Sequence, residues 1–395
     1  MTAEPVSRAV TSGVQLHFAP TRGTGISLSP ELCQRVRFRK SACRKCVEIC
    51  PEEAISLNPG PQISELCSGC GLCVRACPTE VFESDLYPDG YYLDQVTSLL
   101  DDRKVSGDRK KLSICCRRAE RPSTGAVGVP CLGTVGENVL FGAALAGFEE
   151  VALITGRCEH CHLKSAEHLM KRSIRRAGAL AIGMGLDEVS FTMVRREKEK
   201  RAPVGRREMI SGMANRVRTS ARNIASEEDP GVRDRSKMEP GMNGDKGVRE
   251  SPGRNLLRRL LRGRRWEGAR SVAYNRELPW ARMRIDENRC TACGTCAAVC
   301  PWGAVLSSRN GESHILSFRP SACTNCSLCQ DACAEDAITF DAEVWIADIL
   351  QEKTEVVATI SSGWCTFCGD VIPAGMGEVC PTCEKRQVSA AHLKR

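Results

Sequence analysis

All 25 cysteines of this chain fall into four groups, and their spacings are those of metal or cluster ligands. Eight lie within residues 33–77, five within 115–161, eight within 290–333 and four within 365–383. Thiolates at such spacings bind iron–sulfur clusters or zinc. A chain of 395 residues has room for two to four domains. The sequence therefore predicts a multidomain protein with several separate sulfur-ligated centres.

Disulfide bonds are the alternative use of so many cysteines. The first 20 residues lack the apolar core of a signal peptide, and no segment approaches the roughly 20 apolar residues of a membrane span. Cysteines in an unexported chain stay reduced and serve as ligands more often than as disulfides. We therefore expect a cytoplasmic protein with bound metal.

Positive charge is concentrated in one segment. The net charge is +8, yet residues 195–270 alone hold 22 Lys/Arg against 11 Asp/Glu. Low periodicity and many Gly, Pro and Ser residues predict a basic, largely disordered linker over 195–280. Within it, residues 254–265 form a basic amphipathic patch, which suits a partner-docking helix, a solvated linker, nucleic acid or an anionic membrane.

Three cysteine triplets follow the pattern C-x2-C-x2-C, and in each a fourth cysteine follows after three intervening residues. The first and second triplets continue into Cys-Pro and match each other position for position, which indicates an internal repeat; Ala334 replaces the proline of the third. This pattern is typical of [4Fe–4S] binding, with zinc as the alternative. The three sets are Cys67, Cys70, Cys73, Cys77; Cys290, Cys293, Cys296, Cys300; and Cys323, Cys326, Cys329, Cys333.

The motif nearest the N-terminus departs from this pattern. Cys43, Cys46 and Cys50 lack a cysteine shortly before them, and the nearest upstream cysteine is Cys33. A longer loop costs only slightly more closure entropy than a short one, so Cys33 is our predicted fourth ligand. The alternative is an incomplete ligand set with a free Cys33.

Both pairs of motifs resemble the two-cluster bacterial ferredoxins, which are small α+β folds. The resemblance implies one such module over residues 1–100 and another over 281–345, each with two [4Fe–4S] clusters and crossed ligation. The implied ligand sets are Cys33, Cys43, Cys46, Cys77 and Cys67, Cys70, Cys73, Cys50 in the first module. In the second module they are Cys290, Cys293, Cys296, Cys333 and Cys323, Cys326, Cys329, Cys300.

The region over 110–194 alternates strand and helix signals. Residues 112–116, 126–130, 151–155 and 189–194 read as strands. Thr134 and Glu137 form a capping box that opens a helix ending at Gly147, and a second helix runs from Ser165 to about Gly183. The pattern predicts an open α/β domain with a parallel sheet.

The cysteines of this middle domain each follow a predicted strand, where the carboxyl ends of a parallel sheet form one edge. Five thiols meeting there can supply the ligands of a [2Fe–2S] cluster, or some can be buried apolar residues. They are Cys115, Cys116, Cys131, Cys158 and Cys161. His160 and His162 flank the last of them, and we expect structural or hydrogen-bonding roles for both.

Residues 129–133 and 144–162 resemble the delta subunit of methyl-viologen-reducing hydrogenase. The resemblance implies a [2Fe–2S] cluster and electron transfer to a heterodisulfide-reductase-like flavoprotein. The family continues its first cysteine strand with a further cysteine where this chain has Arg117, so either Cys115 or Cys116 remains a candidate ligand.

Residues 360–390 hold two metal knuckles, which resemble a zinc ribbon or a rubredoxin-like module. Four thiolates suit zinc or a single iron. Asp370 stands where a rubredoxin carries an aromatic residue, which favours zinc. The predicted ligands are Cys365, Cys368, Cys380 and Cys383.

We therefore expect an electron-transfer subunit with four [4Fe–4S] clusters, one [2Fe–2S] cluster and one zinc or iron ion. The expected donor is of the hydrogenase or formate dehydrogenase type. No catalytic residues are predicted. One alternative is a thiol–disulfide redox enzyme that uses the middle-domain cysteines, and another is a cluster-containing protein that binds nucleic acid through the basic segment.

Overall fold

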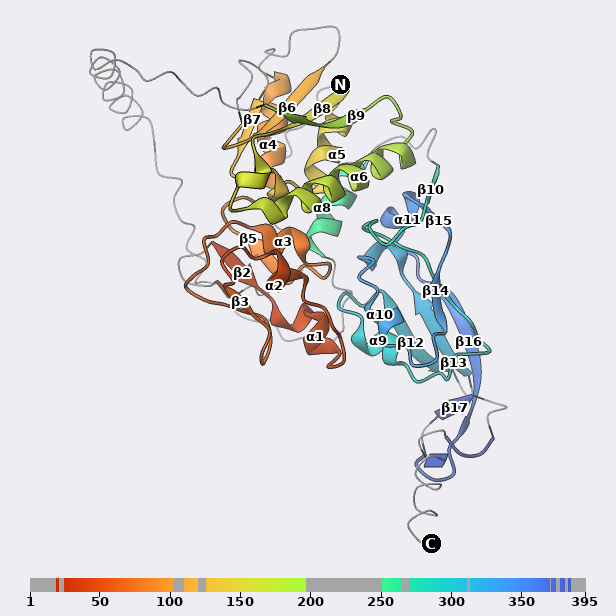
Figure 1. Ribbon diagram of the computed structural model, residues 1–395. Helices are drawn as coiled ribbons and strands as arrows, with labels where there is room; N and C mark the ends of the chain where they lie inside the picture. The colour runs from red at the N-terminus through yellow and green to blue at the C-terminus, as the bar shows by residue number, and fades with distance from the viewer. Residues whose placement is uncertain are drawn as a thin grey trace, which may run out of the picture. The chain divides into compact units, whose positions relative to one another are not determined.

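A computed structural model describes residues 19–20, 25–101, 110–119, 126–196, 251–263, 270–310, 313–369, 371–373, 377–380 and 383–384. The chain divides into two units, and all of these residues belong to the one formed by 1–196 and 248–395 (Figure 1). The other unit is 197–247. None of the described helices is long and apolar enough to cross a membrane. Mixed α/β structure over several regions is confirmed.

The N-terminal region consists of short helices and strands, because proline, glycine and the cysteine motifs interrupt every regular segment. Two small antiparallel sheets form, one in the order β1-β2-β5 and one from β3 and β4. The strands are β1 (Ala19–Pro20), β2 (Ile26–Leu28), β3 (Ile55–Ser56), β4 (Gln62–Ile63) and β5 (Phe82–Ser84). The helices are α1 (Gln34–Arg37), α2 (Lys45–Ile49) and α3 (Leu72–Ala76).

The middle region is a four-stranded sheet in the order β7-β6-β8-β9, and every pair of neighbours is parallel. The predicted open parallel sheet is therefore confirmed. Its strands are β6 (Lys111–Cys116), β7 (Ala126–Val129), β8 (Glu150–Thr155) and β9 (Ser190–Arg195). Its helices are α4 (Asp89–Asp101), α5 (Glu137–Ala146) and α6 (Glu167–Gly183).

The start of α5 corrects one prediction and its end confirms another. Gly136, not Thr134, is the residue that precedes the helix, and the Thr134 hydroxyl instead donates a hydrogen bond to the carbonyl of Cys131 at 2.7 Å. The capping box is therefore wrong. At the other end Gly147 adopts a φ of 102°, a left-handed conformation that glycine tolerates without a Cβ clash.

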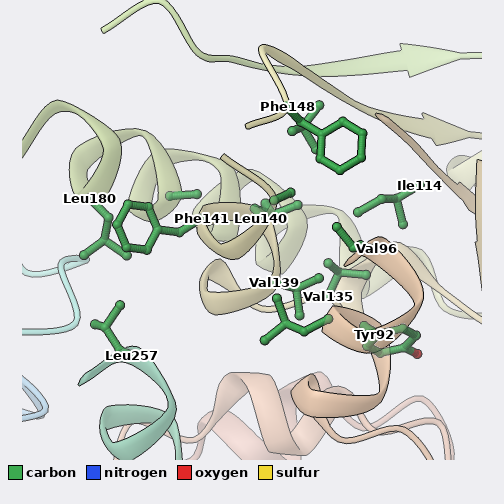
Figure 2. Packing of buried hydrophobic residues seen from close by; sticks show 14 of the residues in the cluster. Tyr92, Val96, Ile114, Val135, Val139, Leu140, Phe141, Phe148, Leu180 and Leu257 are labelled. Atoms are coloured by element: carbon green, nitrogen blue, oxygen red, sulfur yellow. The ribbon is translucent and has the colours of Figure 1, made fainter. Parts of the chain in front are cut away.

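One apolar core joins α4, α5 and α6 to the sheet. It contains Tyr92 and Val96 of α4, Phe141 of α5 and Leu180 of α6 (Figure 2). The same core includes Leu257, which comes from a helix more than 70 residues further along the chain (Figure 2).

That helix, α8 (Pro252–Leu261), overturns part of the predicted linker over 195–280. Ser251 caps it by accepting a hydrogen bond from the Arg254 amide at 3.1 Å, and Leu257 and Leu261 are buried. Four leucines in two adjacent pairs give the helix an apolar face strong enough to outweigh its arginines. Residues 197–250 and 264–269 of the predicted linker lie outside the described residues.

The C-terminal region repeats the small α+β arrangement and adds a longer sheet. Its short helices are α9 (Thr295–Val299), α10 (Leu328–Asp331) and α11 (Ala347–Leu350). Its strands are β10 (Ser271–Ala273), β11 (Met283–Ile285), β12 (Val305–Asn310), β13 (Ser313–Phe318), β14 (Ile338–Phe340), β15 (Glu343–Trp345), β16 (Glu355–Trp364) and β17 (Val371–Pro373). β12, β13, β16 and β17 form one antiparallel sheet, while β10 pairs with β15 and β11 with β14.

Candidate functional site

The thiols of the N-terminal module gather around two separate cavities. Each cavity is lined by three cysteines from one motif and the distant fourth cysteine of the other, which is the crossed arrangement that the ferredoxin resemblance implies. We call these groups site 1 and site 2. Site 1 comprises Cys33, Cys43, Cys46 and Cys77. Site 2 comprises Cys50, Cys67, Cys70 and Cys73.

The C-terminal module brings its cysteines together in the same way. We call the two groups site 4 and site 5. Site 4 comprises Cys290, Cys293, Cys296 and Cys333, whose charges act on one another. Site 5 comprises Cys300, Cys323, Cys326 and Cys329, which line one cavity.

A recurring backbone geometry surrounds these thiols. After the last cysteine of every motif, the amide four residues on donates a hydrogen bond to that sulfur. The four pairs are Ala54 to Cys50 at 3.4 Å, Val81 to Cys77 at 3.4 Å, Ala304 to Cys300 at 3.2 Å and Ala337 to Cys333 at 3.4 Å. Amide donors stabilise a thiolate, so the motifs predispose each sulfur to act as a ligand.

The three complete triplets also contain left-handed residues between their cysteines. The residue before each short helix has a positive φ, and these residues are Gly71 at 76°, Gly294 at 69° and Ser327 at 63°. A second left-handed position lies two residues earlier, at Gly69, Ala292 and Asn325. Such conformations are costly for residues other than glycine, and they persist where a site requires them.

The motif of Cys43, Cys46 and Cys50 lacks these left-handed turns between its cysteines. Cys33 joins site 1 through a different local backbone structure. Cys33 ends a short 3-10 helix over Pro30–Leu32 and is 8 % exposed. Its carbonyl begins α1 by accepting the amide of Arg37 at 3.0 Å, so the loop between Cys33 and Cys43 is partly helical.

The donor sets fit iron–sulfur clusters chemically. Burial, then the charges of Cys77, Cys43 and Cys33, raise the pKa of Cys46 to about 12. Burial, then Cys293, with smaller contributions from Cys290 and Cys333, raises the pKa of Cys296 to about 12. Buried thiols that repel one another as thiolates lose their protons only against a bound cation. Iron supplies that positive charge.

The middle domain has a larger cavity, of about 240 Å³, at the carboxyl ends of its strands. We call its four lining cysteines site 3, which comprises Cys116, Cys131, Cys158 and Cys161. Cys115 does not line the cavity; its side chain is fully buried among Ala119 and Ile154. Burial, opposed by the Gly133 amide, and then the charges of Cys161, Cys116 and Cys158 raise the pKa of Cys131 to about 11. Four such thiols suit a [2Fe–2S] cluster.

Basic side chains surround site 3. Arg117, Arg118 and Arg157 line the cavity, and the guanidinium of Arg118 donates to the carbonyl of His160 at 3.2 Å. His162 Nε2 lies 2.9 Å from Glu52 Oε1, so this histidine contacts the N-terminal module. The His162 side chain thus has a polar partner, whereas at His160 the contact with Arg118 is made by the backbone carbonyl.

The four cysteines of the tail, which we call site 6, lie close enough to share one ion. Their sulfur atoms all lie within 4.8 Å of one another, and Cys368 Sγ is 3.6 Å from Cys380 Sγ. A tetrahedral Zn–S₄ site with bonds of about 2.3 Å has edges of roughly 3.8 Å, so the donor set fits zinc. The amide of Cys380 donates to Cys365 Sγ at 3.3 Å, and such amide bonds lower the pKa of Cys365 to about 6. Asp370 lies outside the described residues.

Sequence reasoning missed the residues that join the modules. Gln34 donates from Nε2 to the carbonyl of Cys326 at 2.8 Å, and the indole of Trp302 is 1 % exposed within the N-terminal core. No local pattern identifies Gln34, because its partner lies 292 residues away. Trp302, which directly follows Cys300 and Pro301, could have been noticed in the sequence, because a large aromatic side chain is expected to pack into a core.

Comparisons with known proteins agree with this geometry. Residues 282–334 match a family described as a 4Fe-4S dicluster domain, and residues 40–87 match one described as an LdpA Fe-S cluster-binding domain. The chain is 30 % identical over 54 residues to an uncharacterized ferredoxin of Methanocaldococcus jannaschii, which is 14 % of this chain and 70 % of that protein. Iron–sulfur binding and ferredoxin-like electron transfer are thereby confirmed. The chain belongs to the ferredoxin family.

Proposed function

We propose that this chain is an electron-transfer subunit that carries four [4Fe–4S] clusters at sites 1, 2, 4 and 5 and one [2Fe–2S] cluster at site 3. The observation that carries the proposal is the gathering of cysteines into five separate four-thiol groups. When bound, such clusters supply reversible one-electron oxidation and reduction. The domains expected over 1–100, 110–194 and 281–345 hold these sites in the proposed architecture.

The protein's own contribution is to hold the sulfurs in place and control their surroundings. Amide donors to Cys50, Cys77, Cys300 and Cys333 stabilise negative charge on sulfur. Burial of most sulfurs excludes water, and this opposes the stabilisation of negative charge on sulfur. The balance between these two influences sets the reduction potential of each site.

The proposed partners are a donor of the hydrogenase or formate dehydrogenase type and a heterodisulfide-reductase-like flavoprotein as acceptor. The resemblance of the middle domain supports the acceptor, and the basic residues Arg117, Arg118 and Arg157 around site 3 suit an acidic partner surface. Reduced thiols at all of these sites require a reducing compartment, so we place the protein in the cytoplasm.

At site 6 we propose structural zinc in a small ribbon over residues 360–390. β16 pairs with β17 beside the thiols, and the ion would fix a segment that has few apolar contacts of its own. Zinc suits this structural role because it has no redox chemistry. Metal analysis that returned iron instead of zinc at site 6 would replace the ribbon with a rubredoxin-like centre.

Elemental analysis and electron paramagnetic resonance (EPR) test the main proposal. Protein purified without oxygen should contain about 18 iron atoms and a similar amount of acid-labile sulfide, with both cluster types visible after reduction. A few iron atoms without sulfide would disprove the proposal. Proteins that co-purify under the same conditions identify the donor and acceptor.

A second candidate function is thiol–disulfide exchange at site 3, which the size of its cavity favours. Two thiols of the site would be oxidised to a disulfide while a small disulfide substrate is reduced to two thiols, with two protons and two electrons transferred. Under this alternative the reduced protein lacks a [2Fe–2S] signal but keeps its four cubane clusters, and it consumes a small disulfide stoichiometrically.

A further inference from the structure

Gln34 touches two sulfur sites that belong to different modules. Its side chain lines the cavity of site 1 beside Cys33, and its Nε2 donates to the carbonyl of Cys326 at site 5. Gln34 is 6 % exposed, so this partly buried hydrogen bond is costly to break on the glutamine side.

Trp302 makes the reciprocal contact. It lines the cavity of site 5, yet its side chain packs into the core of the N-terminal module with Leu32 and Ile49. Nearby, the Arg37 guanidinium donates to the carbonyls of Val299 at 2.7 Å and Ala298 at 2.9 Å. Sites 1 and 5 are therefore joined by side chains from both directions.

A second junction has the same form. Glu52 lines the cavity of site 2 and contacts His162, which lines the cavity of site 3, at 2.9 Å. A further small cavity is lined by both Cys70 of site 2 and Pro130, the residue before Cys131 of site 3. The hydroxyl of Ser165 also donates to the carbonyl of Ile49, next to Cys50, at 3.2 Å.

Within each module the two sites are already neighbours. Cys46 of site 1 and Cys73 of site 2 are buried in one apolar core, and Cys329 of site 5 packs against the apolar core that contains Cys296 of site 4. Among the described residues, no side-chain hydrogen bond and no shared cavity joins a cysteine of site 4 to site 1, 2 or 3. The order of neighbours is thereby fixed.

We propose that the five sulfur sites form a single fixed row in the order 4-5-1-2-3, joined between modules by Gln34 and Trp302 at one junction and by Glu52 and His162 at the other. This inference rests on the proposed function for the cluster content of the sites. The row differs from the order along the chain, because the C-terminal module docks against site 1. Gln34, Trp302, Glu52 and His162 are positioning residues.

Removing one site at a time tests the row. Cys326→Ala at site 5 and Cys293→Ala at site 4 change the second cysteine of equivalent triplets in one module, so each is the matched control of the other. Full-length variants, purified without oxygen and fully reduced, should each lose one cluster's iron. The EPR signals of sites 1 and 2 are assigned by their loss in Cys46→Ala and Cys70→Ala.

Of these two variants, the row predicts that only Cys326→Ala reduces the magnetic broadening of the site 1 signal and slows its relaxation in microwave power saturation. Cys293→Ala should leave that signal as in the unaltered chain, because site 4 lies beyond site 5. Equal effects of the two variants, or no effect of either, would overturn the order.

The same comparison applies at the other end of the row. Cys70→Ala should slow the relaxation of the site 3 signal, while Cys46→Ala should leave it unchanged; the opposite result overturns the order. Absence of a [2Fe–2S] signal or of iron in the unaltered chain would contradict the proposed function instead. Full iron content without neighbour effects would contradict only the row.

The positioning role of Gln34 is tested by the midpoint potential of site 5. Gln34→Ala removes the side-chain amide that donates to the Cys326 carbonyl, so the midpoint potential of site 5 should become more negative, while those of sites 2 and 4 stay unchanged. The matched control is Gln330→Ala, because Gln330 donates to the carbonyl of Ile338 at 3.0 Å within its own module. An unchanged potential in Gln34→Ala, or an equal shift in Gln330→Ala, would contradict the positioning role.

Discussion

Neighbouring cysteines in this chain have different environments, and Cys115 and Cys116 show it most clearly. They are consecutive on β6, so their side chains point to opposite faces of the sheet. Cys116 lines the site 3 cavity, whereas Cys115 is buried beside Ala119. A strand's two-residue period therefore decides which thiol is available as a ligand.

The first prediction follows from that difference. Cys131→Ser should abolish the iron and the EPR signal of site 3, because its thiol lines the cavity, while Cys115→Ser should retain both. Iron analysis and EPR of the two full-length variants provide the measurement. Loss of the signal in Cys115→Ser with normal iron at the other sites would make Cys115 a ligand.

Ser327 offers a second prediction at the scale of one residue. It has a φ of 63° at the position where the other two triplets have Gly71 and Gly294. Ser327→Gly should stabilise the C-terminal module by about 0.5–1 kcal/mol, because relief of the left-handed conformation exceeds the added freedom of the unfolded chain.

The matched variant reverses that change in the same module. Gly294→Ser places a side chain at a φ of 69° and should destabilise by a similar amount. The midpoint temperature of unfolding, followed by circular dichroism of the cluster-loaded protein, should rise for Ser327→Gly and fall for Gly294→Ser. A fall for both would show that the serine hydroxyl matters more than the backbone.

At the scale of helices and strands, an ion pair ties the start of α5 to α6. Glu137 Oε1 lies 2.7 Å from Arg176 NH1, and both side chains are largely buried. Burial raises the pKa of Glu137, but Arg176, its own helix amide, Arg75 and Arg172 together lower it to about 2. The carboxylate therefore stays charged in the folded protein.

Glu137→Gln should destabilise the protein by about 3 kcal/mol, the free energy that corresponds to this pKa shift. Because the folded pKa is depressed, the contribution is complete above the ordinary pKa of 4.5 and disappears only as the pH falls toward 2. The difference in unfolding midpoint between variant and unaltered chain should thus be equal at pH 6 and pH 8. A difference that changed over this range would assign the effect to another group.

α8 shows how an element can belong to a core far from it in sequence. Leu257 is 2 % exposed in the core of the middle domain, and the Asn138 side-chain amide donates to the carbonyl of Gly253 at 3.1 Å. Arg254, also buried, donates to the carbonyl of Cys323. The helix thus connects the middle domain with site 5.

Leu257→Ala should destabilise the protein by about 2–5 kcal/mol, because it leaves a cavity in that core. Asn255→Ala on the exposed side of α8 is the control and should change stability by less than about 0.5 kcal/mol. Thermal unfolding by circular dichroism measures both. Equal midpoints for the two variants would mean that α8 does not pack in solution as it does here.

At the scale of the whole molecule, the cysteines and residues 197–247 of the basic segment lie in different units. The unit 197–247 contains no cysteine, while the other unit contains all 25. Electron transfer and any binding by residues 197–247 can therefore be separated experimentally.

Replacing residues 197–247 with a Gly/Ser linker of equal length should leave iron, sulfide and EPR signals unchanged, and electron transfer to an artificial acceptor intact. The replacement removes 12 Lys/Arg and 9 Asp/Glu without shortening the connection, so it tests nucleic-acid binding by this part of the basic segment. Loss of cluster content in this variant would show that the segment supports the sulfur sites.

The sequence by itself determined the four cysteine groups and the end of α5, because each depends on residues within one motif or one helical turn. It also determined the parallel sheet, because strand and helix signals alternate along residues 110–194. It did not determine the start of α5, the burial of α8 or which of Cys115 and Cys116 lines a cavity. Nor did it determine the row of sites, since Gln34 and Cys326 are 292 residues apart. Only the tertiary structure decides such contacts, because they depend on how apolar faces from distant segments pack together, and local spacing carries no record of that packing.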